Sequence, residues 1–323
     1  MSLARGDSSR LLWMDQLRGY TIFGMVLVNY LGQFEVMPWM LKHHREGMSY
    51  ADTIAPLFIF IVGMGFRMSL VRRAEQVGVG RAMLAAARRY AVLVLIGIAV
   101  YGPNDPGSWY DALVDIGVGG LLSLPFLLAG TWVRVAVAFG YLALFQGLFS
   151  LSDYGPWLVG NSFNGGPLGV FSWASILLLG TVAQDIASRG NPARTLLGWG
   201  VGLCAAGWAL RAAWPGLKAE WPFSQYWMTA PYVLYSTGLC FLTCLFFIWL
   251  CGRRGIELPH LTVLGRNPLV LYLVQYALIN LSGTFIVGRD ASVPMALLGF
   301  ALFYMACYAV AWRLWKDGVV VKI

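Results

Sequence analysis

Long apolar stretches separated by short polar segments dominate the pattern of residues along this chain. A helix needs about 20 residues to cross a bilayer. Ten stretches approach that length, at about residues 11–31, 53–71, 82–101, 111–130, 132–150, 171–187, 195–213, 227–250, 261–286 and 292–313. The pattern therefore predicts an all-α fold, a polytopic integral membrane bundle of about ten transmembrane helices that forms one domain over residues 1–323.

The first predicted helix carries polar side chains along one face. Asp15 and Arg18 are three residues apart, so they can pair as neighbours on the helix surface. At about 100° per residue, Asn29 falls within roughly 40° of that stripe and about 21 Å further along the axis. Ionisable groups at membrane depth normally face a bundle interior or a water-filled path. The stripe is therefore predicted to line such a path.

Composition and charge agree with a membrane protein whose two termini are cytoplasmic. Hydrophobic residues make up 59% of the chain and charged residues 12%, which excludes an ordinary soluble protein. With ten spans and a cytoplasmic N-terminus, fifteen Lys and Arg residues fall inside and five outside, as the positive-inside rule expects. The net charge of +8 is then a consequence of topology, and no nucleic-acid partner is expected. The arginines of residues 72–89 are suited to nucleotide phosphates, but lipid headgroups are the simpler interpretation.

Two adjacent histidines, His43 and His44, lie in the predicted extracytoplasmic loop after the first helix. Imidazole is suited to general-base chemistry near neutral pH, and an ordinary solvated loop is the alternative interpretation. Ser49 and Asp52 have the spacing of a capping box at the start of the second helix. The loop and the helix start together form a candidate catalytic segment.

A polar break interrupts the ninth apolar stretch at the sequence GRNP, residues 265–268. Its proline removes a backbone donor, so the helix is expected to be kinked or broken there. Arg266 and Asn267 lie in the predicted cytoplasmic half. Together with Asp15 and Arg18 they are predicted to form a polar vestibule on that side.

Other polar or reactive residues lie within the apolar stretches. Asp111 can cap the fourth predicted helix, but Asp115 lies about one turn inside it and needs a partner or a wet cavity. The five cysteines lie in or at the edge of apolar stretches without a histidine beside them. They are interpreted as small buried hydrophobic residues, and no metal is expected.

Several motifs, in their order along the chain, resemble the heparan-α-glucosaminide N-acetyltransferase family and its bacterial relatives. MDQLRGYTIFGMVLVNY is followed by KH and by GMSYADTIAPLFIFIVGMG, and later by SQYWMTAPYVLYSTGL and LGRNPLVLY. The similarity runs from about residue 14 to residue 313. The chain departs from the family's V-L-Q-R-[IL]-G motif, because Asp115 stands where the family has arginine.

The resemblance implies a transmembrane acetyltransferase. Members of the family take acetyl groups from acetyl-CoA on the cytosolic side and deliver them to an amino sugar on the far side, with a catalytic histidine in the first non-cytosolic loop. That role carries over to His43. His44 is the alternative, because the loop here is one residue shorter and lacks the family's usual tryptophan. Asn29 and Asp52 carry over as polar partners of the histidine.

We therefore expect acetyl-CoA as a co-substrate near Asp15, Arg18, Arg266 and Asn267, and no metal. The expected partners are membrane lipids and a sugar acceptor with an amine or hydroxyl, and a homodimer is compatible with the sequence. The expected location is the bacterial inner (plasma) membrane. A multi-pass transporter or flippase is the alternative function, with the charged stripe as its translocation path. A second acyltransferase superfamily has its catalytic histidine in the first helix, and the absence of histidine there argues against it.

Overall fold

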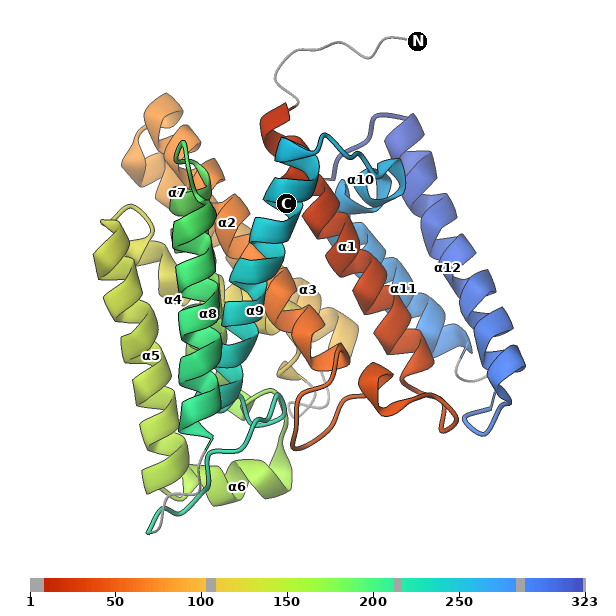
Figure 1. The fold of residues 1–323 in the computed structure, drawn as a ribbon, viewed down its shortest axis with the longest axis horizontal. Helices are drawn as coiled ribbons and strands as arrows, with labels where there is room; N and C mark the ends of the chain where they lie inside the picture. The colour runs from red at the N-terminus through yellow and green to blue at the C-terminus, as the bar shows by residue number, and fades with distance from the viewer. Residues whose placement is uncertain (1–8, 103–108, 212–215, 283–287, 322–323) are drawn as a thin grey trace. The chain divides into compact units, whose positions relative to one another are not determined.

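The computed structural model describes residues 9–102, 109–211, 216–282 and 288–321, and the regular structure of these residues is helical (Figure 1). The elements are α1 (Ser9–Leu31), η1 (Trp39–Leu41), α2 (Ala51–Val77), α3 (Val79–Tyr101), α4 (Ala112–Ser123), η3 (Leu124–Phe126), α5 (Thr131–Leu151), α6 (Tyr154–Asn161), α7 (Gly166–Ala187), α8 (Ala193–Leu210), α9 (Ala230–Phe247), η4 (Ile248–Arg253), α10 (Pro259–Gly265), α11 (Pro268–Ser282) and α12 (Val293–Lys316). The predicted all-α fold is confirmed.

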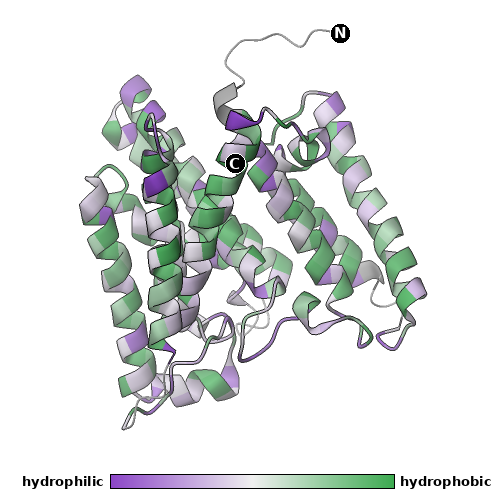
Figure 2. Ribbon diagram, viewed as in Figure 1, coloured by the Kyte–Doolittle hydropathy of each residue, from purple (hydrophilic) through white to green (hydrophobic). Residues whose placement is uncertain are grey.

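Six of the described helices are long and apolar enough to cross a membrane: α2, α3, α5, α7, α9 with its continuation η4, and α12. Hydrophobic residues run along these helices, whereas hydrophilic residues gather toward helix ends and in the connecting segments (Figure 2). The chain is therefore a multi-pass helical membrane protein.

The predicted count of ten spans is not supported. Four of the predicted spans do not correspond to described helices that are long and apolar enough to cross a membrane. The α1 helix carries Asp15 and Arg18, and the 18 residues of α8 are rich in glycine and tryptophan. The 12 residues of α4 rise about 18 Å, less than the roughly 30 Å hydrocarbon core. The ninth stretch is divided into α10 and α11 at Arg266 and Asn267, as the GRNP sequence predicted. Between the predicted stretches 132–150 and 171–187, the structure also contains the α6 helix, which the sequence pattern missed.

The chain divides into two compact units. The first comprises Met1–His43, Ser49–Ile54 and Thr243–Lys322, and the second comprises His44–Met48 and Ala55–Leu242. The prediction of one transmembrane domain over residues 1–323 stays a prediction.

The α1 helix is the centre of the first unit and packs against α10, α11, α12 and η4. At Gly19, a Cβ atom would collide with the backbone of Leu261, and a Cβ atom at Gly265 would collide with the backbone of Asp15. Glycine is therefore required on both helices for α10 to approach the first half of α1. Near the other end of α1, Tyr30 stacks on Phe303 of α12, with ring centroids 4.7 Å apart.

The α7 helix is the buried centre of the second unit, where it packs against α4, α5 and α8. An ionic cluster ties this helix to two others. Asp185 accepts hydrogen bonds from Arg67 of α2, at 3.1 Å, and from Arg134 of α5. Arg134 is fully buried and also donates to the Thr181 hydroxyl at 2.7 Å, while Arg67 also donates to the Leu127 carbonyl at 2.5 Å. We call these residues the Asp185 cluster.

Candidate functional site

The candidate catalytic pair consists of His43 and Asp52, which the first unit brings together. The imidazole Nδ1 of His43 lies 2.8 Å from Oδ1 of Asp52. The Asp52 side chain has no exposed surface, whereas the His43 side chain is 35% exposed. A buried carboxylate thus holds an accessible imidazole.

The helix cap that was predicted for α2 also positions Asp52. Its Oδ2 accepts a hydrogen bond from the Ser49 backbone N–H at 2.9 Å, and its own backbone N–H donates to the Ser49 Oγ at 3.3 Å. This reciprocal pair confirms the capping box. The Ser49 hydroxyl also donates to the Lys42 carbonyl at 2.8 Å, so the residue before His43 is tied to the same cap.

The geometry defines which nitrogen of His43 can do chemistry. An ionised carboxylate only accepts hydrogen bonds, so Nδ1 of His43 carries the proton that points at Asp52. In the neutral ring the Nε2 lone pair is then available, and no described residue bonds that atom. A carboxylate that fixes the tautomer and orientation of an imidazole is the arrangement that histidine bases use. The pair is therefore suited to taking a proton from an amine or hydroxyl.

The other two predicted catalytic residues lie differently. Asn29 is half-buried near the end of α1, and no hydrogen bond among the described residues joins its side chain to His43. Instead, α1 presents Gly24 to Tyr50 and Ile54, at the start of α2. His44 is half-buried and directly follows His43.

The predicted cofactor-binding residues gather in part at the other end of α1. Arg18 donates to Oδ1 of Asp15 at 3.0 Å, which confirms the predicted pair on one helix face. Arg266, exposed at the break between α10 and α11, lies close enough to act on the Asp15 carboxylate by charge. One carboxylate among two guanidinium groups leaves a net positive charge, which suits an anionic group such as a phosphate.

Asn267 has a different set of contacts. Its Nδ2 donates to the Val319 carbonyl at 2.9 Å, and its Oδ1 accepts from the Val321 N–H at 2.8 Å. Both ends of the amide therefore hold the segment that follows α12.

Asp115 lies in the second unit, where its side chain is 1% exposed. Neither carboxylate oxygen has a hydrogen-bond partner among the described residues. The N-cap predicted for α4 is confirmed, because the Asp111 side chain accepts from the Ala112 N–H at 2.7 Å. Two aspartates one turn apart thus have opposite roles, since one caps the helix and the other is buried without compensation.

We expect Asp115→Ala to raise the melting temperature or leave it unchanged. An unmatched buried polar group costs about 1–3 kcal/mol, and its removal relieves that cost. The matched control is Asp111→Ala, which removes the cap and should lower stability by about 1 kcal/mol. Melting of the purified variants in detergent measures both. A clear loss of stability in Asp115→Ala would show that the carboxylate has a stabilising partner.

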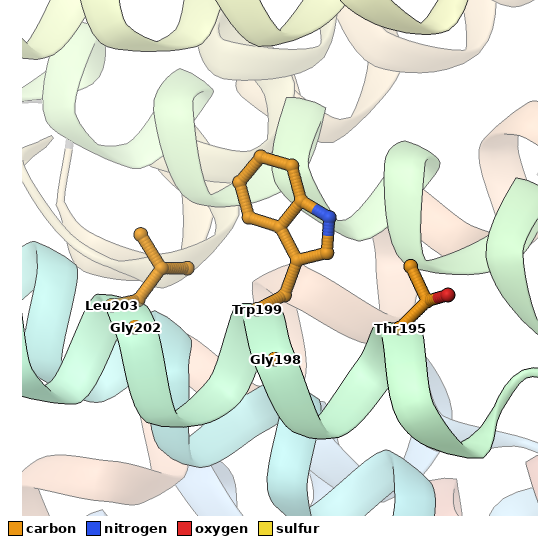
Figure 3. A pocket seen from close by; sticks show the side chains of 5 residues that line it. All are labelled: Thr195, Gly198, Trp199, Gly202 and Leu203. Atoms are coloured by element: carbon orange, nitrogen blue, oxygen red, sulfur yellow. The ribbon is translucent and has the colours of Figure 1, made fainter.

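The described residues contain no group of three or more His, Cys, Asp or Glu side chains placed to hold a metal ion. Cys240, Cys244, Cys251 and Cys307 are buried, as predicted, whereas Cys204 is half-buried. In the second unit, α8 lines an open groove of about 430 Å³ with Thr195, Gly198, Trp199, Gly202 and Leu203 (Figure 3). Its lining is almost entirely apolar and offers no acid–base group.

Fold and site together define a multi-pass helical membrane protein whose first loop carries a histidine held by a buried carboxylate. A family model for the catalytic region of heparan-alpha-glucosaminide N-acetyltransferase matches residues 10–207, and the chain belongs to that family. The matched range contains the His43–Asp52 pair and the Asp15–Arg18 pair.

Two mammalian proteins named heparan-alpha-glucosaminide N-acetyltransferase are similar to part of the chain. The mouse protein is 32% identical over 111 residues, which cover 32% of this chain and 16% of the mouse protein. The human protein is 34% identical over 106 residues, which cover 31% of this chain and 15% of the human protein. The chain thus matches only a small part of the length of these relatives.

Proposed function

We propose that this protein is a transmembrane acetyltransferase that moves an acetyl group from cytoplasmic acetyl-CoA to an amino sugar or other glycan on the extracytoplasmic side. The observation that carries the proposal is the 2.8 Å contact between His43 and the buried Asp52 within the family-matched segment. The mammalian relatives are named for acetyl transfer to a glucosaminide nitrogen. An amine or hydroxyl acceptor of this kind needs the base that the pair can supply.

In the proposed reaction, Nε2 of His43 takes the proton from the acceptor amine or hydroxyl. The acceptor atom attacks the thioester carbonyl, the carbon–sulfur bond breaks, and the thiolate of CoA leaves with its electron pair. The imidazolium then returns the proton to that thiolate. Asp52 stabilises the imidazolium while it exists, since it accepts from Nδ1. Transfer through an acetyl-histidine uses the same atoms in two steps.

The donor's phosphates are proposed to bind near Asp15, Arg18 and Arg266. Two guanidinium groups against one carboxylate support an anion site there. Asn29 is proposed to reach the thioester oxygen or the imidazole as the donor binds. His44 remains the alternative base, and Asn267 supports the vestibule by holding the segment after α12. The proposed location is the bacterial inner membrane. The proposed partners are membrane lipids and a sugar acceptor, and the proposed assembly is a homodimer.

Sealed membrane vesicles containing the protein test the proposal when they receive radiolabelled acetyl-CoA on the cytoplasmic face. Glucosamine and glucosamine-terminated oligosaccharides are the acceptors on the opposite face. Labelled N-acetyl product is expected with the wild-type protein and not with empty vesicles. Movement of a solute without consumption of thioester would support the transporter or flippase instead.

The proposed orientation leads to a separate prediction about labelling. Cysteine introduced at Glu46, an exposed position in the His43 loop, should react with an impermeant thiol reagent in intact cells. Cysteine at Glu75, an exposed position near the end of α2, should react only after permeabilisation. Lys and Arg are mostly retained inside, and both termini are accordingly proposed to be cytoplasmic. The reverse pattern of labelling would overturn the proposed sidedness.

A further inference from the structure

The phenol groups of Tyr20 and Tyr50 lie close enough to interact within the first unit. Tyr50 lies between Ser49 and Asp52 in the chain, directly before α2, and Tyr20 lies midway along α1. Both residues are partly buried. Burial raises the pKa of Tyr50 above its ordinary value, and the Tyr20 hydroxyl adds to that shift. The phenol of Tyr50 therefore keeps its proton at neutral pH.

Gly24 provides the space in which Tyr50 reaches α1. A Cβ atom at position 24 would lie 3.1 Å from the Tyr50 hydroxyl and 2.6 Å from Cδ1 of Ile54. Tyr20 and Gly24 are four residues apart and share a face, which is about 140–180° around the helix from Asn29. The segment that carries Asp52 thus meets the Tyr20 face of α1, opposite the charged stripe.

This face of α1 also carries a buried hydrogen-bond donor without an acceptor among the described residues. Four residues before Tyr20 on the same face, Gln16 is fully buried. Its Oε1 accepts from the Cys251 thiol at 3.2 Å, but its Nε2 has no acceptor among the described residues. A buried donor without an acceptor is costly, so a ligand with a carbonyl oxygen would gain from it.

On the basis of the proposed function, we infer that Gln16, Tyr20 and Tyr50 form a line of hydrogen-bond donors that positions the carbonyl-bearing arm of the acyl donor below the catalytic pair. The arm of acetyl-CoA is uncharged and carries two amide carbonyls and the thioester carbonyl. Neutral N–H and O–H donors match these groups, whereas the charged Arg18 and Arg266 match the phosphates. The three residues bind and orient the donor, and take no proton from it.

The test is the binding of two probes to the purified chain in lipid nanodiscs. Tyr50→Phe removes one O–H and retains the ring, and should weaken acetyl-CoA binding about tenfold, as the loss of one hydrogen bond to a ligand does. Gln16→Leu should weaken it in the same direction. The second probe, adenosine 3′-phosphate 5′-diphosphate, has the nucleotide phosphates but lacks the arm. Its Kd should stay unchanged in both variants.

Tyr304→Phe is the matched control. It removes another phenol hydroxyl of the first unit, bonded to His260, and should change neither Kd. An unchanged acetyl-CoA Kd in both Tyr50→Phe and Gln16→Leu would overturn the inference. An equal loss for both probes would also overturn it, because the residues would then only support the fold. If the wild-type chain binds neither probe, the proposed function itself is overturned. If the wild-type chain transfers acetyl groups and the Kd for acetyl-CoA is the same in both variants, only this inference is overturned.

Discussion

Replacement of His43 with alanine should lower turnover by about 10²–10⁴-fold, the usual contribution of a positioned general base. The fall should appear in kcat, while the Kd for acetyl-CoA stays near its wild-type value. The reason is distance, since the proposed phosphate-binding residues lie near the start of α1 and His43 lies beyond its end. Single-turnover transfer of labelled acetyl from vesicles, combined with a binding assay, separates the two quantities.

Two companion variants make the histidine prediction specific. His44→Ala changes the neighbouring imidazole and should have a mild effect. Asp52→Asn keeps the size of the side chain, but its amide can donate a hydrogen bond to Nδ1 of His43 as well as accept one. It should lower kcat, because the imidazole can then adopt the tautomer that lacks a lone pair on Nε2. Full activity in a His43→Ala, His44→Ala double variant would remove both histidines from the chemistry and favour a transporter. Loss of activity in His44→Ala alone would assign the base to His44.

Local patterns predicted the helix cap at the start of α2 because its hydrogen bonds join residues that are three positions apart. Ser49 and Asp52 are three apart, and the spacing alone indicated the capping box that the structure contains. The Asp15–Arg18 pair followed from helix geometry in the same way. The break at residues 265–268 followed from the missing N–H of proline, which no neighbour along the helix can replace.

Contacts between distant segments could not be predicted in this way. The resemblance implied that Asn29 partners the catalytic histidine, and that role stays a prediction, whereas the packing of Gly24 against the start of α2 was not predicted. Nothing local distinguishes Gly24 from other helix glycines, because its role depends on Tyr50 from the following loop. The count of ten spans is not supported among the described residues for a related reason. Apolar composition alone does not show that α4 ends after 12 residues.

The Asp185 cluster was missed although the sequence contained a signal for it. Arg67 falls within a predicted span, and an ionisable group at that depth implies a partner. Arg134 is one of the fifteen basic residues that the sequence analysis counted on the cytoplasmic side. In the structure it is fully buried and donates a hydrogen bond to Asp185. The separation of 51 residues between the two hides the pairing from any local pattern.

Asp185→Ala should destabilise the protein by about 3–5 kcal/mol, because it leaves the buried charge of Arg134 uncompensated. Arg67 also loses a partner, although its contact with the Leu127 carbonyl remains. For a chain of this size the loss corresponds to a melting temperature lower by about 4–7 °C. Thermal melting in detergent, followed by tryptophan fluorescence, measures it. The control is Asp153→Asn, which breaks the ion pair with Lys218 and should leave the melting temperature unchanged, because both side chains are largely exposed.

A double variant separates two effects: the lost attraction between Arg134 and Asp185, and the cost of leaving the buried charge of Arg134 without a partner. When Arg134→Leu is added to Asp185→Ala, no fully buried charge remains in the cluster, and apolar residues can replace a buried ion pair with little loss. The double variant should therefore melt at a higher temperature than Asp185→Ala alone, even though it carries one more substitution. If its destabilisation instead equals the sum of the two single effects, Arg134 and Asp185 are not coupled. In that case the packing of α7 against α5, and not the ion pair, holds this part of the second unit together.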